Sequence, residues 1–165
     1  MTRLSIFLFL LLTASFACQL QQERAMIHIC NAKYVTDCNA MTRRAKRGDM
    51  YRTNFTVISK HSWGNNVTFK LTLYTEGMSI QIANSRVCEI KEIPWLYHFI
   101  TNYSNMRDAC PYPPGVLGLY NLEFSAKNIP SSILSLGKGK VLCKFLYEVT
   151  KTQEPLVESS LLFRC

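Results

Sequence analysis

Apolar and polar residues alternate without a break along one segment of the chain, Val67–Tyr74. Side chains of a β-strand point alternately to its two faces, so this pattern predicts a strand that presents Phe69, Leu71 and Leu73 on one face. Similar patterns, separated by turn residues, predict further strands over residues 25–38, 51–58, 78–82, 117–124, 140–149 and 159–165. In the segment 117–124, the same period places Tyr120, Leu122 and Phe124 on one face.

One segment follows a helical spacing instead. Between positions 90 and 100 the apolar residues recur at intervals of three and four, and Pro94 stands where the first turn of a helix tolerates proline. The spacing predicts a helix from about Pro94 to Asn105. Cys88 precedes this helix and Cys110 follows it, and we expect these two cysteines to form a disulfide that pins the helix to a sheet.

Several strands, frequent turn signals and one helix indicate an all-β fold. We expect an immunoglobulin-like sandwich of two sheets, shaped as a cup, with one short helical insertion and disulfide stabilisation. The 165 residues are 48% hydrophobic and 18% charged, a balance that suits a folded domain with a substantial core.

The amino terminus has the pattern of a cleavable secretory signal. Arg3 precedes the apolar run Leu4–Leu12, and the small residues Ser15 and Ala17 stand just before Cys18. The apolar run is too short to cross a bilayer. We therefore expect a signal peptide over residues 1–17, a single domain over residues 18–165, and a secreted protein, with the lysosomal lumen as another destination of the same pathway.

Cysteines and glycosylation sequons agree with export. Cleavage after Ala17 leaves seven cysteines and cleavage beyond Cys18 leaves six; an even number favours six structural cysteines. The three sequons begin at Asn54, Asn66 and Asn102. The net charge of +8 is compatible with simple solubility or with an anionic partner.

Catalytic and metal-binding motifs are absent from the sequence. None of the histidines, His28, His61 and His98, stands in a nucleophile motif, and the chain has no His-Glu-x-x-His or Cys-x-x-Cys. We expect a protein that is not an enzyme and that uses neither a cofactor nor a metal.

A basic cluster, Arg44-Ala45-Lys46-Arg47, precedes Gly48. Three interpretations of this cluster stay open: a solvated loop between strands, a rim that binds anions, and a cleavage site for the dibasic-specific convertases of the secretory pathway.

The order of several motifs resembles that of the ML lipid-recognition superfamily. These motifs are the early pair Cys30 and Cys38, the strand 69–74, the segment 87–90 that leads into an aromatic helix, the segments 103–105 and 110–112, and the late strand start at 138–143. The chain is most similar to the ganglioside-activator-like branch and to related secreted insect proteins. It departs from the ganglioside activator in having no cysteine between Cys110 and Cys143.

The resemblance implies a β-sandwich cup that holds a lipid between its sheets. It also implies a disulfide from Cys38 to Cys165, which leaves Cys30 for Cys143. We expect a secreted, non-enzymatic protein that binds a lipid or another small apolar molecule, with a membrane surface or a receptor as a further partner and no nucleic acid. The alternative is a signalling or receptor-binding glycoprotein with a filled core. The cavity candidates are Phe69, Leu71, Leu73, Trp95, Phe99, Tyr120, Leu122, Phe124 and Leu134.

Expression in animal cells tests the expectation of export. The protein should appear in the medium or a lumen, glycosylated and shortened by about 17 residues, as cleavage after Ala17 requires. Intact mass before and after removal of N-glycans measures both changes. Recovery of a full-length, unglycosylated cytosolic chain would contradict the expectation.

Overall fold

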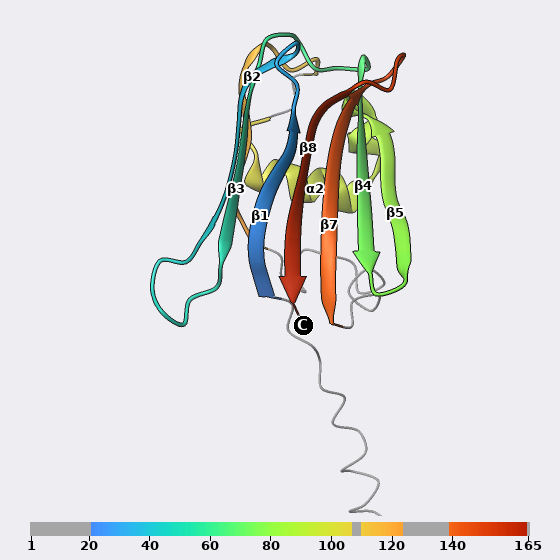
Figure 1. Cartoon of the computed structure of the whole chain (residues 1–165). Helices are drawn as coiled ribbons and strands as arrows, with labels where there is room; N and C mark the ends of the chain where they lie inside the picture. The colour runs from blue at the N-terminus through green and yellow to red at the C-terminus, as the bar shows by residue number, and fades with distance from the viewer. Residues whose placement is uncertain (1–20, 107–109, 124–138, 165) are drawn as a thin grey trace, which may run out of the picture.

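Two antiparallel sheets pack face to face in the computed structural model, which describes residues 21–106, 110–123 and 139–164 (Figure 1). Among these residues, one sheet has five strands in the order β1 (Gln21–Cys30), β8 (Pro155–Arg164), β7 (Lys140–Val149), β4 (Val67–Thr75) and β5 (Met78–Arg86). The other sheet consists of β2 (Val35–Arg43), β3 (Arg52–Ser59) and β6 (Gly115–Leu122). A short 3-10 helix, η1 (Val87–Glu92), leads into the α-helix α2 (Pro94–Tyr103). The expected all-β sandwich of two sheets with a helical insertion is confirmed.

Strand β4 has the faces that its alternation predicts. The inner face of β4 is buried in the core, and Tyr74 is exposed on the outer face. The buried residues are Val67, Phe69, Leu71 and Leu73. The chain then reverses through Glu76 and Gly77, and Thr75 pairs with Met78 to begin β5. Gly77 has a φ of +84°, a conformation that favours glycine in a two-residue hairpin turn.

A row of five aromatic rings lies between the two sheets. Phe55 of β3 lies 5.6 Å from Phe145 of β7, and the ring of Phe69 lies 6.5 Å from Phe145 and 5.0 Å from Tyr147, measured between ring centroids. Trp63 completes the row at 5.0 Å from Tyr147. Each such pair contributes about 0.5–1.5 kcal/mol beyond the area that it buries.

The helix α2 ends two residues before the predicted boundary. Its buried residues, Leu96, Phe99 and Ile100, join the same core cluster as the inner face of β4. The chain leaves the helix in an extended conformation at Ser104, which forms a bridge to Leu119 of β6. Asn105 then accepts a hydrogen bond from the Gly118 N–H at 2.9 Å and donates one to the Val116 carbonyl at 2.8 Å. These contacts cover the outer edge of β6, an edge that would otherwise expose unpaired backbone groups.

The predicted faces of β6 are wrong in part. Leu117 and Leu119 point into the sandwich, whereas Tyr120 lies on the outer face, against Gly118. Asn121 has a φ of +53°, and the register with β3 shifts at this position. This irregularity returns Leu122 to the interior, where its side chain is fully buried.

Two disulfides are formed in the described part of the chain. Cys88 bonds to Cys110, as predicted, with Cα atoms 5.6 Å apart. Cys30 bonds to Cys38 across the crossing from β1 to β2, so the expected pairs Cys38–Cys165 and Cys30–Cys143 are wrong. Cys143 is a free thiol on the inner face of β7 with 1% of its surface exposed, and it takes the place of a small apolar residue there. Cys165 lies outside the described residues.

Replacement of Cys88 by alanine tests the bridge beside the helix. The disulfide closes a loop with a sequence separation of 22 residues. A loop of this length predicts a loss of about 2–5 kcal/mol in the free energy of unfolding when the bridge is removed, measured by denaturant titration.

Cys110→Ala is the matched control for the Cys88 variant. It should lower the free energy of unfolding by as much as Cys88→Ala does. The double variant should lower it little further, because all three variants lose the same bridge. Additive losses, or a tryptic peptide that links Cys88 to another cysteine, would contradict the pairing.

Candidate functional site

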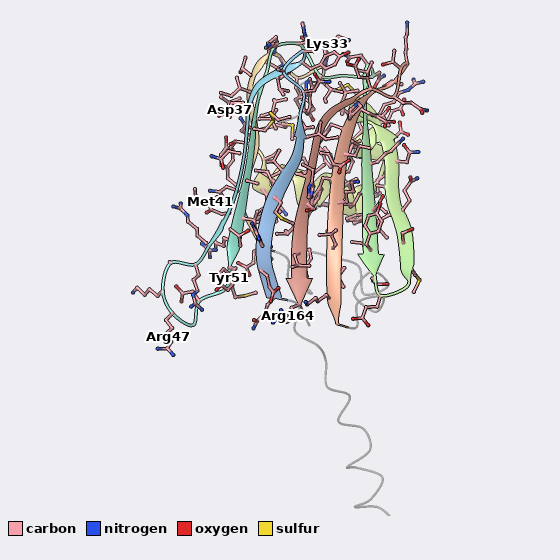
Figure 2. The ribbon with its side chains drawn as sticks, viewed as in Figure 1. Lys33, Asp37, Met41, Arg47, Tyr51 and Arg164 are labelled. Carbon is pink, nitrogen blue, oxygen red and sulfur yellow. A yellow bond between two sulfur atoms is a disulfide. The ribbon has the colours of Figure 1, made fainter. Side chains whose placement is uncertain are left out.

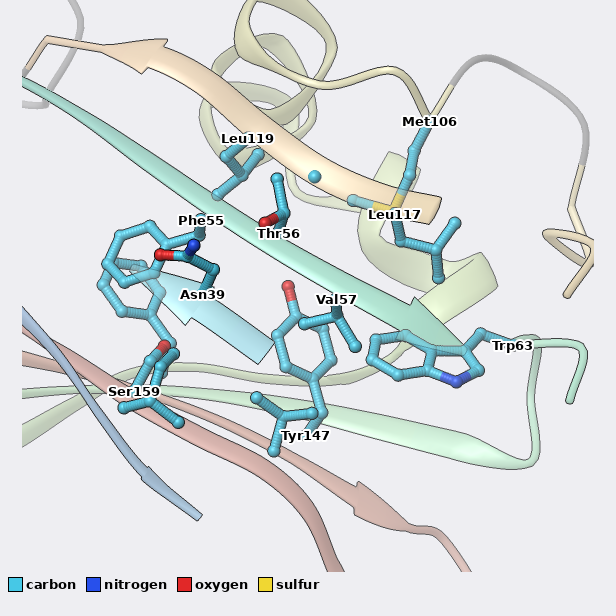
Figure 3. A pocket seen from close by; sticks show the side chains of 14 residues that line it. Asn39, Phe55, Thr56, Val57, Trp63, Met106, Leu117, Leu119, Tyr147 and Ser159 are labelled. Carbon is cyan, nitrogen blue, oxygen red and sulfur yellow. The ribbon is translucent and has the colours of Figure 1, made fainter. Parts of the chain in front are cut away.

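A small cavity lies between the two sheets, beside the row of aromatic rings (Figure 3). The volume of this cavity is about 40 Å³, which is room for roughly three water-sized molecules. Its walls are mainly apolar, and none of the lining side chains is charged. The lining residues are Ile27, Asn39, Phe55, Thr56, Val57, Trp63, Met106, Leu117, Gly118, Leu119, Phe145, Tyr147, Val157 and Ser159.

The three-stranded sheet forms one wall of the cavity through two inward rows. In the strand register, Phe55 lies beside Leu119, and Val57 lies beside Leu117. A third row, Asn39–Thr56–Gly118, runs between these two. Because side chains of a strand alternate between its faces, those of Asn39 and Thr56 point to the outer face of the sheet. The backbone of the third row therefore forms the floor of the cavity, and Gly118 adds no side chain to it.

Trp63 closes one end of the cavity, although it belongs to no regular strand. Its backbone exchanges two hydrogen bonds with Tyr112, at 2.9 Å and 2.8 Å. A Cβ atom added at the neighbouring Gly64 would lie 3.0 Å from Pro111 and 3.6 Å from the Cys88 sulfur. The Cys88–Cys110 bridge therefore packs directly against the backbone beside Trp63. The disulfide, the segment 110–112 and Trp63 thus form one connected support for this end of the cavity. Met106 reaches the cavity from the chain that follows α2.

Two hydroxyl groups supply the polar character of the opposite wall. Tyr147 of β7 and Ser159 of β8 both line the cavity, and Figure 3 shows the Tyr147 ring extending from its strand toward β3. Burial, followed by the proximity of Tyr112, raises the pKa of the Tyr147 hydroxyl. This hydroxyl therefore stays protonated at neutral pH and can donate a hydrogen bond.

The indole nitrogen of Trp63 is another polar atom at this site. Among the described residues it finds no hydrogen-bond partner, although the side chain is only 3% exposed. A buried N–H without a partner is uncommon in folded proteins.

The cavity candidates from the sequence occupy other places. Five of them are packed in the core: Phe69, Leu71, Leu73, Phe99 and Leu122. Trp95 is half-buried on α2, and Tyr120 is half-buried on the outer face of β6. None of these seven lines the cavity. Phe124 and Leu134 lie outside the described residues. Strand alternation could have identified three lining residues as pointing into the sandwich: Val57, Leu117 and Tyr147. It could not have identified Trp63, because the sequence around Trp63 predicts only a turn.

The sequon asparagines differ in accessibility. Asn66 and Asn102 are exposed, whereas Asn54 is half-buried and its side-chain oxygen accepts a hydrogen bond from the Asn121 N–H at 2.7 Å.

No protein-family model matches the chain, and no curated protein matches it significantly. In the described segments, no helix has the length and apolar character needed to cross a membrane. These segments also contain no group of three or more His, Cys, Asp or Glu side chains placed to hold a metal ion.

The raised pKa of Tyr147 makes a testable contribution to alkaline unfolding. A tyrosine ionises near pH 10 in the unfolded chain but at higher pH in the folded protein, so its contribution to stability is present below pH 10 and is lost as pH rises above that value. Between pH 9 and pH 11, this one group should remove about 1.4 kcal/mol from the free energy of unfolding. Tyr147→Phe should abolish that part of the pH dependence. Identical profiles for the variant and the wild-type protein, from denaturant titrations at each pH, would refute the contribution.

Proposed function

We propose that the protein is a secreted, non-enzymatic binding protein that holds the apolar part of a lipid, or another small apolar molecule, between its two sheets. The observation that carries this proposal is the apolar cavity with both sheets in its walls. Ligand sites are typically mostly apolar hollows with a few well-placed polar groups, and this cavity has that composition. The two disulfides suit an oxidising compartment outside the cytosol.

The lining favours a neutral group inside the cavity. A charged group would lie there without a partner of opposite charge, because none of the lining residues is ionised at neutral pH. A hydroxyl, carbonyl or ether oxygen could accept a hydrogen bond from Tyr147, while its hydrocarbon portion contacts Val57 and Leu117.

The size of the cavity limits how much of the ligand it can hold. A methylene group is about as large as a water molecule, so roughly three fit, and their burial contributes about 2.4 kcal/mol. A micromolar affinity requires about 8 kcal/mol. The bound molecule must therefore make further contacts at the cavity mouth or widen the gap between the sheets.

The resemblance of the motif order to that of the ML lipid-recognition superfamily supports the same role. The alternative, a receptor-binding glycoprotein with a solid sandwich, is favoured by one observation: the inner faces of β4 and β6 are packed, with Phe69 and Leu122 at most 1% exposed. The two functions differ in whether the isolated protein takes up an apolar ligand.

Filling the cavity tests the proposal. Val57→Phe places a ring in the cavity and should weaken binding of a fluorescent fatty acid by about tenfold or more, equivalent to 1.4 kcal/mol. Val116→Phe is the matched control, because Val116 is 50% exposed on the outer face and pairs with Ile58, the next residue along β3. It should leave the affinity unchanged.

Thermal unfolding of both variants shows whether each is folded. Mass spectrometry of organic extracts from the native protein then identifies any ligand acquired during expression. If the folded wild-type protein binds no fatty-acid or lipid probe and carries no apolar ligand, the carrier function fails and the solid recognition module replaces it.

A further inference from the structure

The loop between β2 and β3 is the most exposed basic segment in the described part of the chain. We call residues 44–51 the basic loop. Every residue from Arg44 to Met50 is exposed. Figure 2 shows the loop extending away from the sandwich, with Arg47 at its far end. Exposed loop tips of this kind are preferred sites of proteolytic cleavage.

The conformation of the basic loop depends on few contacts. The Lys46 N–H donates to a carboxylate oxygen of Asp49 at 3.0 Å, and the Asp49 N–H donates to the Lys46 carbonyl at 3.1 Å. Arg44 lies over the ring of Tyr51 at 5.2 Å from its centroid. These contacts lie within the loop, so a protease can straighten it without disturbing the core.

The charges of the loop have a directional order. Arg44, Lys46 and Arg47 stand at the fourth, second and first positions before the Arg47–Gly48 bond, and small Gly48 follows it. Guanidinium and ammonium groups at fixed spacing are recognised by carboxylates lining the subsites of a protease, through charge-assisted hydrogen bonds. Arg43 lies outside this set, although it adds the same charge to the same surface.

We propose that the Arg47–Gly48 peptide bond is a processing site for a basic-residue-specific convertase of the secretory pathway. The reaction is a hydrolysis: water adds across the C–N bond, Arg47 gains a carboxylate and Gly48 becomes a new amino terminus. The proposal depends on export, and it is independent of ligand binding.

Cleavage would leave a folded protein of two chains. Strand β2 stays paired with β3 from Val35 to Arg43, and β1 stays paired with β8. Of the two disulfides in the described residues, Cys30–Cys38 lies before the cut and Cys88–Cys110 lies after it, so neither links the two pieces. Strand pairing and core packing therefore hold them together. The cavity then has walls from both chains, with Ile27 on the first and Val57 on the second.

Incubation of the purified, oxidised full-length protein with a convertase of this class tests the site. Intact mass and amino-terminal sequencing should find one cut, before Gly48, and native size-exclusion chromatography should show one species of unchanged size. Arg47→Ala and Arg44→Ala should slow the cut by about tenfold or more, whereas Arg43→Ala, which removes the same charge, should change the rate by less than about twofold.

A synthetic peptide of residues 40–52 serves as the unfolded reference. If the enzyme cuts the peptide but leaves the folded protein intact, the loop is protected and the proposal is overturned. A first cut at another bond, or equal slowing by Arg43→Ala, overturns the assignment of the recognition residues. Separation of the two pieces under native conditions overturns the two-chain product.

Discussion

The distance between the two sheets depends on the row of five aromatic rings that runs from Phe55 to Trp63. Rings are rigid and large, and this row spans the interior from Phe55 of one sheet to Phe145 and Tyr147 of the other, so it helps to set how closely the sheets approach. The cavity lies where the rings of one sheet meet smaller residues of the other, Val57 and Leu117. Protein interiors are otherwise close-packed, so a gap at this position indicates that the surrounding rings cannot collapse into it. The same residues that stabilise the sandwich thus leave the cavity between its sheets.

Alternation in the sequence was sufficient to predict β4, the extent of β7 and the class of fold. It succeeded there because one face of each strand is buried, and a slip of one residue would expose every apolar side chain. It failed on β6, where Asn121 adopts a left-handed conformation that no apolar pattern records. It also missed the cavity lining, because a pattern identifies which residues point inward but not where the opposing side chains leave space. Trp63 is the extreme case. It belongs to no regular strand, and backbone hydrogen bonds with Tyr112 hold it at the end of the cavity.

The disulfides show a different limit. Cys30 and Cys38 are separated by eight positions, and the chain between them crosses from one sheet to the other. This crossing brings their Cα atoms to 6.0 Å, a normal disulfide spacing. The resemblance to a family suggested longer links, and the sequence alone allows fifteen connectivities for six cysteines. Cys143 was left as the partner of Cys30 once the resemblance paired Cys38 with Cys165, but it is a free thiol buried among the inward-facing residues of β7.

The stability of the fold and the shape of the cavity are therefore coupled at one end of the molecule, whereas the basic loop is separate from both. The segment 110–112 holds the Trp63 backbone through two hydrogen bonds with Tyr112, and the Cys88–Cys110 bridge holds that segment. A change in this support would alter the site and the fold together. The basic loop has no such link, since its hydrogen bonds are local and every residue from Arg44 to Met50 is exposed. Because local stability in proteins varies with the number of buried contacts, the loop can open or be cut at little cost to the core. The architecture thus leaves the loop accessible to other proteins while the core and the cavity stay intact.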